Sequence, residues 1–331
     1  MEAPRVPLVS IGVPVYNGER GLSRCLESLL QQDYGNLEII VSDNASTDGT
    51  PDIAAQYARR DPRIRYVRSD RNRGTWWNFN RVFELSTGQY FMWAAHDDDR
   101  DSGFISACVE RLEQSPDAVL CQAHTSASIE GRTEVLYVAS LDSFASVHTV
   151  VDRYRETLKR FPATAMYGLY RASAMSSTMM FARVIATDMA FIQELSIHGR
   201  FVQVPGTMFR YSARPSWNTV QQDARVVLGR QKPWWYIPFI VMLLHNVRRI
   251  GKSAIPAGLK IRLCGVLAGD VVRQCALKVA LRVAGALCPE ARKESLARAM
   301  YWRWMHNPNL QVVDHDLFFE RVCKPQIGWW R

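Results

Sequence analysis

The chain has 331 residues, of which 47% are hydrophobic, 22% charged and 11% aromatic, and its formal net charge is +9. This composition supplies enough apolar mass for a sizeable core, and it excludes a disordered chain, a collagen-like chain and a small disulfide-stapled domain. The seven cysteines are odd in number and contain no CxxC pair, so we interpret them as reduced residues and not as a zinc site or a disulfide framework.

The first hundred residues alternate short apolar runs with segments whose apolar residues recur at helical spacing. Such alternation indicates a mostly parallel sheet with helices on both faces, whose ligands bind beyond the carboxyl ends of the strands. We expect Thr50 to cap the second helix, with Pro51 in its first turn. The predicted strands are 8–14, 37–42, 64–68 and 90–95, and the predicted helices are 20–32, 50–60 and 76–85.

Further helices are predicted at 103–115 and 150–160, and a helix around 190–198 runs into a short strand at 200–205. From about residue 221 the pattern turns helical, and apolar and basic residues alternate around a long stretch at 259–287. The chain is therefore expected to join an α/β body to a helical C-terminal region.

The charge is unevenly distributed between these two parts. Residues 221–331 contain 18 basic and 7 acidic side chains, whereas residues 1–220 contain 23 basic and 25 acidic ones. A basic region that also holds six of the ten tryptophans suits an anionic membrane surface or a polyanion. The alternatives are a solvated extension whose tryptophans pack on the body, and an oligomerisation surface. These tryptophans are Trp234, Trp235, Trp302, Trp304, Trp329 and Trp330.

No secretory leader is recognised, and no apolar stretch reaches the roughly 18 residues that cross a bilayer. We therefore expect a cytoplasmic protein that is soluble or peripheral on the inner face of the cytoplasmic membrane.

Three adjacent carboxylates, Asp97, Asp98 and Asp99, follow the predicted strand at 90–95. Adjacent carboxylates repel one another and need a compensating cation. Oxygen ligands on a strand-end loop suit Mg²⁺ or Mn²⁺, which commonly bridge carboxylates to substrate phosphates. Taken alone, such a triplet is more often a solvated acidic turn.

Two other strand ends carry polar residues that suit a nucleoside. Tyr16 follows the first strand and can stack on a base, and Asp43 follows the second and can accept a hydrogen bond from a base N–H. Because parallel strands end at one edge of a sheet, these residues and the acidic triplet together predict a nucleotide-diphosphate site.

In their order and spacing, five segments of the chain resemble glycosyltransferase family 2, the inverting group with the GT-A fold. The resemblance covers roughly residues 6–215 and implies a GT-A, Rossmann-like, mostly parallel sheet with helices on both faces. The segments are Pro14-Val15-Tyr16-Asn17, Ser42-Asp43-Asn44-Ala45-Ser46-Thr47-Asp48-Gly49-Thr50, Asn72-Arg73-Gly74, Gly88-Gln89-Tyr90, and Asp97-Asp98-Asp99 at the DXD position.

The resemblance also implies a domain organisation. A GT-A domain would occupy residues 1–220, with a donor-binding half at about 1–100 and an acceptor-binding half at about 101–220. Residues 221–331 would form the helical, basic and tryptophan-rich region.

Around the donor, the resemblance implies a role for each matching residue. The backbone at Pro14, Val15 and Tyr16, together with Tyr16 and Glu19 themselves, would border the nucleoside, and Asp43 would contact the base.

At the reacting groups, Asp97 would approach the ribose or the metal, while Asp98 and Asp99 would hold Mn²⁺ or Mg²⁺ on the donor diphosphate. The catalytic base of the family is an acid that opens a helix about ninety residues further on, where this chain offers Asp188. Glu194 is the competing acid, one and a half helical turns later, and is expected to turn away from the site.

The chain departs from the family pattern after the second-domain strand, where relatives often carry a histidine. Residues 209–215 contain none, so Arg210 or Arg214 can neutralise the diphosphate instead, and metal dependence stays open. Trp76 and Trp77 can wall the acceptor cleft, although helix core is an equal alternative for one of them.

Together these residues predict an inverting glycosyltransferase that moves a sugar from a UDP-, dTDP- or GDP-linked donor to a hydroxyl of a glycan or lipid-linked acceptor. It would act in the synthesis of a cell-surface polysaccharide or glycolipid, and a homo-oligomer stays open. The base would take the acceptor proton, and the cation would absorb charge on the leaving diphosphate.

The sequence also bears on three other classes of protein. The alternative is a catalytically inactive, glycosyltransferase-like binding or scaffold module. A sugar-nucleotide pyrophosphorylase would need a glycine-rich basic loop, which residues 13–19 do not provide. Nucleic acid is not expected as a partner, because the body lacks a basic face.

Overall fold

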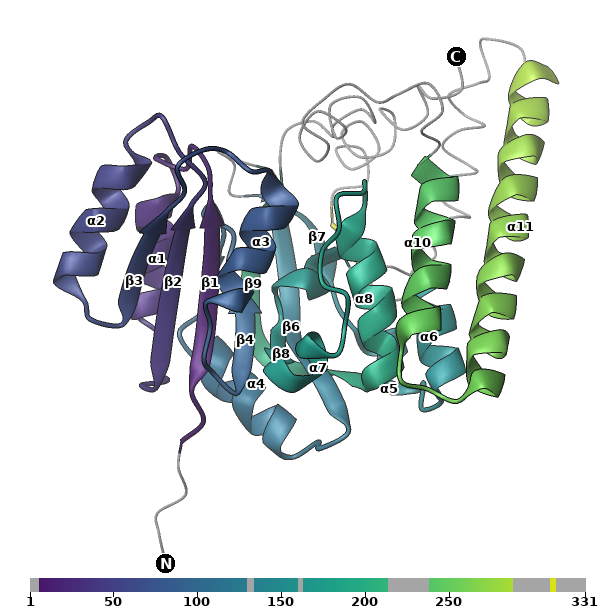
Figure 1. Cartoon of the computed structure of the whole chain (residues 1–331), viewed down its shortest axis with the longest axis horizontal. Helices are drawn as coiled ribbons and strands as arrows, with labels where there is room; N and C mark the ends of the chain where they lie inside the picture. The colour runs from purple at the N-terminus through teal and green to yellow at the C-terminus, as the bar shows by residue number, and fades with distance from the viewer. Residues whose placement is uncertain (1–5, 130–133, 160–162, 214–237, 288–309, 314–331) are drawn as a thin grey trace, which may run out of the picture.

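The computed structural model describes residues 6–129, 134–159, 163–213, 238–287 and 310–313, which form an α/β fold around one sheet (Figure 1). The strands are β1 (Val9–Val15), β2 (Leu37–Asp43), β3 (Ile64–Arg68), β4 (Tyr90–Trp93), β5 (Asp99–Arg100), β6 (Ala118–Ile129), β7 (Val135–Ala139), β8 (Leu169–Arg171), β9 (Arg200–Ala213) and β10 (Leu310–Val312). The helices are α1 (Leu22–Leu30), α2 (Thr50–Arg60), α3 (Thr75–Glu84), α4 (Phe104–Glu113), α5 (Asp142–Ala145), α6 (Val150–Lys159), α7 (Ala172–Ser176), α8 (Thr187–His198), α10 (Pro238–Lys252) and α11 (Ala257–Leu287), with a 3₁₀ turn at Ala163–Tyr167.

The sheet runs in the order β10-β7-β6-β8-β4-β1-β2-β3, and β9 pairs with both β5 and β6 off this path. The neighbours β4, β1, β2 and β3 are parallel, as the alternation of strands and helices predicts. Their carboxyl ends therefore meet at one edge, which places the loops after β1, β2 and β4 together.

Helices cover both faces of this parallel half. Side chains alternate across a strand, so Ile11 of β1 packs in one cluster with Leu26 of α1, whereas Trp93 of β4 packs in another with Val82 of α3 and Phe191 of α8. Both faces of β1 and β4 are buried, which explains the nearly continuous apolar sequence of these strands.

The start of α2 differs from the sequence prediction. Gly49 is the N-cap residue and Thr50 is the first helical residue, so Thr50 does not cap the helix. Its hydroxyl instead accepts a hydrogen bond from the Gly18 amide at 2.9 Å and donates to Asp48 Oδ1 at 2.6 Å. Thr50 thereby ties the loop after β1 to the loop after β2.

The second half of the sheet is mixed. The three-residue strand β8 lies between β4 and β6 and is antiparallel to both. The strand predicted at 200–205 is only the start of β9, which pairs in parallel with β6 as far as Ala213 and pairs with β5 at Phe209 and Arg210. This continuation brings β9 beside the acidic loop.

The C-terminal helices α10 and α11 pack on α8 and α6, on the flank opposite β3 (Figure 1). Ile250 of α10 and Leu263 of α11 are buried in one cluster with Tyr154 of α6 and Ile197 of α8. The region predicted to be helical also contributes β10, which pairs antiparallel with β7. Trp234, Trp235, Trp302, Trp304, Trp329 and Trp330 lie outside the described residues. Within the described part of the chain, every helix falls short of the length and apolarity needed to cross a membrane.

Candidate functional site

The loops after β1 and β2 are cross-linked by hydrogen bonds between side chains and backbone. The Asn17 amide donates to Ser46 Oγ at 2.9 Å, and the Asn17 side chain accepts from the Thr47 amide at 2.9 Å. Glu19 accepts from the Gly49 amide at 3.1 Å, at the start of α2. The two loops therefore form one rim whose shape is set before any ligand arrives.

Within this rim, the two residues predicted to contact the base are placed very differently. Tyr16 is 45% exposed, so its ring is open to stacking. Asp43 is fully buried, and it accepts hydrogen bonds from the Ser46 amide at 2.8 Å and the Tyr66 hydroxyl at 3.0 Å. Burial, reinforced by this bond to Asp43, raises the pKa of Tyr66 to about 12.

Arg68, at the end of β3, completes the surroundings of Asp43. Its Nε lies 3.3 Å from Asp43 Oδ2, and its Nη2 donates to the Ser46 carbonyl at 2.7 Å. Pro14 and Val15 are buried beneath the rim, so their side chains serve the core. A contact between Asp43 and a base would use the lone pairs that these partners leave free.

The acidic triplet follows β4, and its last residue, Asp99, begins β5, which pairs with β9. Arginines lie against this segment. Arg210 of β9 donates to Asp99 Oδ1 at 3.0 Å and also to Asp101. Arg24 of α1 donates to the Asp97 carbonyl, and its Nε lies 3.8 Å from Asp99 Oδ2. The structure thus supplies cationic partners for the Asp99 carboxylate, the last of the three.

Asp98 is the buried member of the triplet, with 1% of its surface exposed. Its Oδ1 accepts a hydrogen bond from the Ser212 amide at 2.9 Å, whereas its Oδ2 is buried without a hydrogen-bond partner. Burial, with a smaller contribution from Asp97, raises the pKa of Asp98 to about 8.

The donor set fits a divalent cation that is held mainly by its substrate. Within the described ranges, no group of three His, Cys, Asp or Glu side chains converges as a metal cage. Mg²⁺ is commonly held by one or two carboxylates together with substrate phosphates. The unpartnered Oδ2 of Asp98 can serve as one of these carboxylate ligands. Asp99 would serve as the second if its carboxylate exchanged the ion pair with Arg210 for the cation.

Asp188 lies in the first turn of α8, where the helix dipole favours a carboxylate. The N-cap residue of α8, Ala186, lies two residues before Asp188 and has a φ of +60°. The 3₁₀ turn that ends at Tyr167 packs against α8 and β4. The Tyr167 ring lies 6.3 Å from that of Tyr211, whose neighbour Ser212 donates its amide to Asp98. Burial raises the pKa of Tyr167, and so do the negative charges of Asp98, Asp97 and, more weakly, Asp188. Tyr167 therefore lies between the helix that carries the predicted base and the loop that carries the acidic triplet.

Glu194 is not available as a base. It is 2% exposed, forms an ion pair with the buried Arg249 of α10, and accepts a hydrogen bond from the Met179 amide at 2.9 Å. These contacts agree with the expectation that Glu194 turns away from the site.

The two tryptophans of α3 have different surroundings. Trp76 packs against the core cluster around Trp93, and its indole Nε1 is buried without a hydrogen-bond partner. Trp77 lies against two guanidinium groups, with Arg73 at 5.0 Å and Arg81 at 4.9 Å from the ring centroid. A role for Trp76 at the acceptor stays a prediction, and Arg214 lies outside the described residues.

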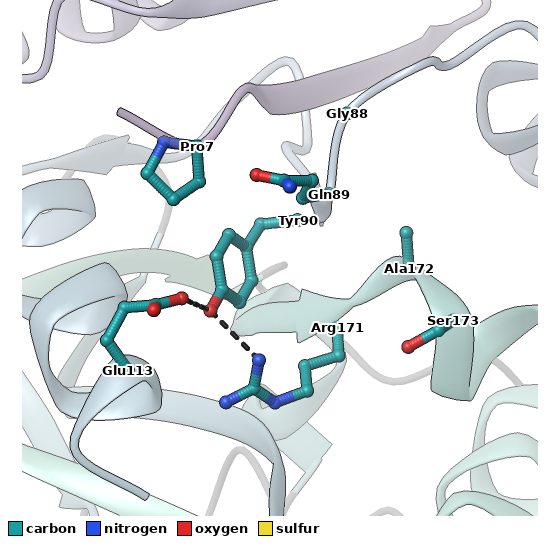
Figure 2. Close-up of a pocket in the computed structure, with 8 residues that line it drawn as sticks. All are labelled: Pro7, Gly88, Gln89, Tyr90, Glu113, Arg171, Ala172 and Ser173. Carbon is teal, nitrogen blue, oxygen red and sulfur yellow. Dashed lines mark hydrogen bonds between the residues drawn. The ribbon is translucent and has the colours of Figure 1, made fainter. Parts of the chain in front are cut away.

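A cavity of about 460 Å³ lies at the opposite edge of the sheet, where β1 and β4 begin (Figure 2). Its polar groups serve one another: the Tyr90 hydroxyl donates to Glu113 and accepts from Arg171 Nη1 at 3.0 Å. Arg171 also donates to the carbonyl oxygens of Ala118 and Leu112. This cavity contains none of the predicted site residues. Its lining is Pro7, Gly88, Gln89, Tyr90, Glu113, Arg171, Ala172 and Ser173.

Several residues that shape the site were missed by the sequence analysis. Arg68 follows β3 at the same sheet edge as Asp43, so the strand-end argument could have found it. Arg24 and Ser212 come from α1 and the end of β9, and only the tertiary structure brings them to the acidic triplet.

The sequence profile described as Glycosyl transferase family 2 matches residues 10–180, which contain the rim, the acidic triplet and Tyr167. The chain belongs to this family. Among curated relatives, this glycosyltransferase-family chain is 34% identical over 110 residues to chondroitin synthase of Escherichia coli, a match covering 33% of the chain and 16% of that protein. It is 30% identical over 107 residues to the glycosyltransferase GlyG of Streptococcus pneumoniae serotype 4, covering 32% of the chain and 36% of GlyG. These matches therefore span well under half of either relative.

Solved structures of other glycosyltransferases share the fold of this family member. Residues 1–349 of S. aureus TarS in complex with UDP align with a TM-score of 0.59 and 18% identity, covering 88% of this chain and 78% of that one. The mannosyltransferase PcManGT of Pyrobaculum calidifontis, in complex with GDP-Man and Mn²⁺, aligns with a TM-score of 0.51 and 18% identity, covering 92% and 82%. The likeness places the sheet and its helices in the GT-A fold class.

Proposed function

We propose that the chain is an inverting glycosyltransferase that moves a sugar from a nucleotide-diphosphate donor to an acceptor hydroxyl. The observation that carries the proposal is that the rim and the acidic triplet follow the parallel strands β1, β2 and β4 at one edge of the sheet. The packing of Tyr167 between α8 and the segment that binds Asp98 supports a base at the start of α8. Family membership and solved neighbours with UDP, UDP-GlcNAc and GDP-Man support the same class of donor.

In the proposed mechanism, the rim binds the nucleoside before the reacting groups meet. Tyr16 stacks on the base, Asp43 accepts from a base N–H, and Asp97 approaches the ribose. Because Asn17 and Glu19 already cross-link the two loops, little ordering entropy is lost when the donor binds.

The diphosphate is bound beside the acidic triplet. Asp98 and Asp99 would hold Mn²⁺ or Mg²⁺, and a cation bound there would supply positive charge to the departing nucleoside diphosphate. Arg210, now paired with Asp99 and Asp101, is near enough to share that charge by a charge-assisted hydrogen bond.

Asp188 is the proposed general base. It accepts the proton of the acceptor hydroxyl as the oxygen attacks the anomeric carbon from the face opposite the leaving diphosphate, so the configuration at that carbon inverts. The proton is held on the Asp188 carboxyl group until the products leave.

The acceptor is proposed to be a glycan or a lipid-linked glycan at the inner face of the cytoplasmic membrane. The name of the chondroitin synthase relative favours polysaccharide synthesis. A peripheral contact of the C-terminal region with anionic lipid is supported by its basic charge and by exposed apolar side chains of α10 and α11, with Leu244 64% and Ile261 73% exposed.

A panel of UDP-N-acetylglucosamine, UDP-glucose, dTDP-glucose and GDP-mannose, each with and without Mn²⁺, tests the proposal. We expect one donor to bind and to be hydrolysed slowly. Asp188→Asn should lower kcat by about 10²-fold or more while leaving the donor Kd within about twofold, because a general base contributes about 10²–10⁴-fold.

Asp152→Asn is the matched control, because Asp152 is also a first-turn acid but lies in α6. It should leave kcat unchanged. Equal kcat for Asp188→Asn and the unaltered chain would contradict the base assignment. Binding of no donor would favour the inactive, scaffold-like alternative.

A further inference from the structure

A buried ion pair connects the C-terminal region to the helix that carries Asp188. Arg249 of α10 is 1% exposed and Glu194 of α8 is 2% exposed, and Arg249 Nη1 donates to Glu194 Oε2. Beside them, Asn246 Nδ2 of α10 donates to Gln193 Oε1 of α8 at 2.8 Å. Figure 1 shows α10 beside α8 on the side away from the parallel half of the sheet. Two polar pairs thus fix the facing surfaces of these helices.

The same ion pair also binds the segment that enters α8. Glu194 Oε2 accepts a hydrogen bond from the Met179 amide at 2.9 Å, and Arg249 Nη2 donates to the Met180 carbonyl. Met180 has a φ of +52°, a conformation that a residue with a Cβ adopts at a cost. The ion pair therefore holds an unfavourable turn in place.

On its other side, this segment is held by α3. The amide of Phe181 donates to Asn80 Oδ1 at 3.0 Å, and Asn80 Nδ2 donates back to the Phe181 carbonyl at 2.9 Å. The Ala182 amide then donates to Thr187 Oγ1 at 2.7 Å, in the first turn of α8. Residues 179–182 are thus clamped between α3 and α10, directly before the helix turn that contains Asp188.

Stability alone does not explain a charged pair at this position. Replacing a buried ion pair by apolar residues of similar volume is often neutral or stabilising. Apolar residues would lose the bonds to Met179 and Met180, however, and those bonds set where the chain turns into α8. Arg249 also lies beyond residues 10–180, the part of the chain that matches the family profile.

We propose that Arg249, acting through Glu194 and the clamped segment 179–182, is a positioning residue for Asp188. The C-terminal region then forms a working part of the transfer site and is more than an attachment to it. This inference rests on the proposed role of Asp188 as the base.

The test compares four variants of the full chain: Arg249→Met, Arg249→Lys, the double variant Glu194→Leu/Arg249→Met, and Arg153→Met. Arg153 is the matched control because it is also a buried arginine, 7% exposed, that bonds α8. Its Nε donates to the Ser196 carbonyl at 2.9 Å, near the other end of the helix and away from residues 179–182.

Four quantities are measured for each variant: thermal stability, amide hydrogen exchange, and the kcat and KM for the best donor of the panel above. In Arg249→Met and in the double variant, we expect residues 178–188 to lose exchange protection while β1 and β2 keep theirs. We expect kcat to fall about ten- to a hundredfold with donor KM within about twofold, because misplacement of a reacting group by about 1 Å costs about 10²-fold.

The double variant should regain stability relative to Arg249→Met without regaining kcat. Arg249→Lys, which keeps a charge and a donor, should regain part of both. Arg153→Met should lose stability and keep kcat at temperatures where it is folded.

The inference is overturned if exchange rises uniformly over the chain in Arg249→Met, or if Arg153→Met lowers kcat as much. It is also overturned if the double variant has native kcat. Failure of the proposed function gives a different result: Asp188→Asn would then have native kcat, whatever the Arg249 variants do.

Discussion

Gly21 packs against the backbone of the acidic loop, so replacing it by alanine should move the candidate donor site. Gly21 is the N-cap residue of α1, and its φ of −115° is open to any residue, so the backbone conformation costs nothing. A Cβ at this position would lie 2.6 Å from the His96 carbonyl oxygen and 3.0 Å from the Asp97 Cα. The obstacle is backbone, and no flexible side chain can move aside to relieve it.

The size of the effect follows from these distances. Restoring ordinary contact requires about 0.8 Å of relative movement between α1 and the loop at 96–99, and overpacking of this kind costs about 1–3 kcal/mol. The same movement displaces Asp97 and Asp98 relative to the rim. We therefore expect Gly21→Ala to raise the Kd of the donor about tenfold, equivalent to about 1.4 kcal/mol.

The assay combines calorimetric unfolding with titration of UDP-N-acetylglucosamine in the presence of Mn²⁺. Gly35→Ala is the matched control, because a Cβ at Gly35 would meet nothing within 4 Å. It should leave both measurements unchanged. Native donor affinity and native stability in Gly21→Ala would refute the argument that this glycine sets the position of the acidic loop.

Three further predictions follow from the packing and the charges. Trp93 is fully buried and in ring contact with five other aromatic residues. Trp93→Ala should lower the free energy of unfolding, measured by urea denaturation, by about 3–5 kcal/mol. Burial lowers the pKa of His245 from 6.5 to about 4, so the folded chain binds this proton less readily than the unfolded chain does. The free energy of unfolding should therefore fall as the pH drops from 6.5 towards 4. His245→Gln should reduce that fall, measured by denaturation at pH 7 and pH 5. Asp43→Asn removes the buried charge that pairs with Arg68 and accepts from Tyr66, so it should weaken donor binding about tenfold in the same titration, and an unchanged Kd would contradict a base contact.

The parallel half of the fold is readable from the sequence because local signals agree with the tertiary structure. The predicted helix 50–60 and strand 64–68 have the observed bounds, since Pro51 marks the start of the helix and apolar spacing marks both elements. β8 was missed because three residues, Leu169–Arg171, are too few for a periodic pattern. The length of β9 was underestimated because pairing with β6, and not its own sequence, carries it to Ala213.

The site divides in the same way. Tyr16, Asp43 and the acidic triplet follow strands, so the strand-end rule predicts them from local sequence. The partners of those residues come from distant segments: Ser212 reaches Asp98, and Arg249 reaches Glu194, across separations that no local pattern spans. Sequence therefore predicts which groups do the chemistry more readily than which groups hold them in position.

In the sheet, β8 lies between β6 and β4, although β4 comes from the first hundred residues and β6 and β8 come later in the chain. This order limits how the chain could be recombined with its relatives. A chimaera joined near residue 100 would keep β4 from one parent and take β8 from the other, so a junction inside the sheet would have to match in register and side-chain volume. The same cut would separate β5 from β9, whose pairing sets Arg210 opposite Asp99. Grafting loops at the carboxyl edge therefore leaves these strand pairings intact, whereas swapping halves of the chain does not.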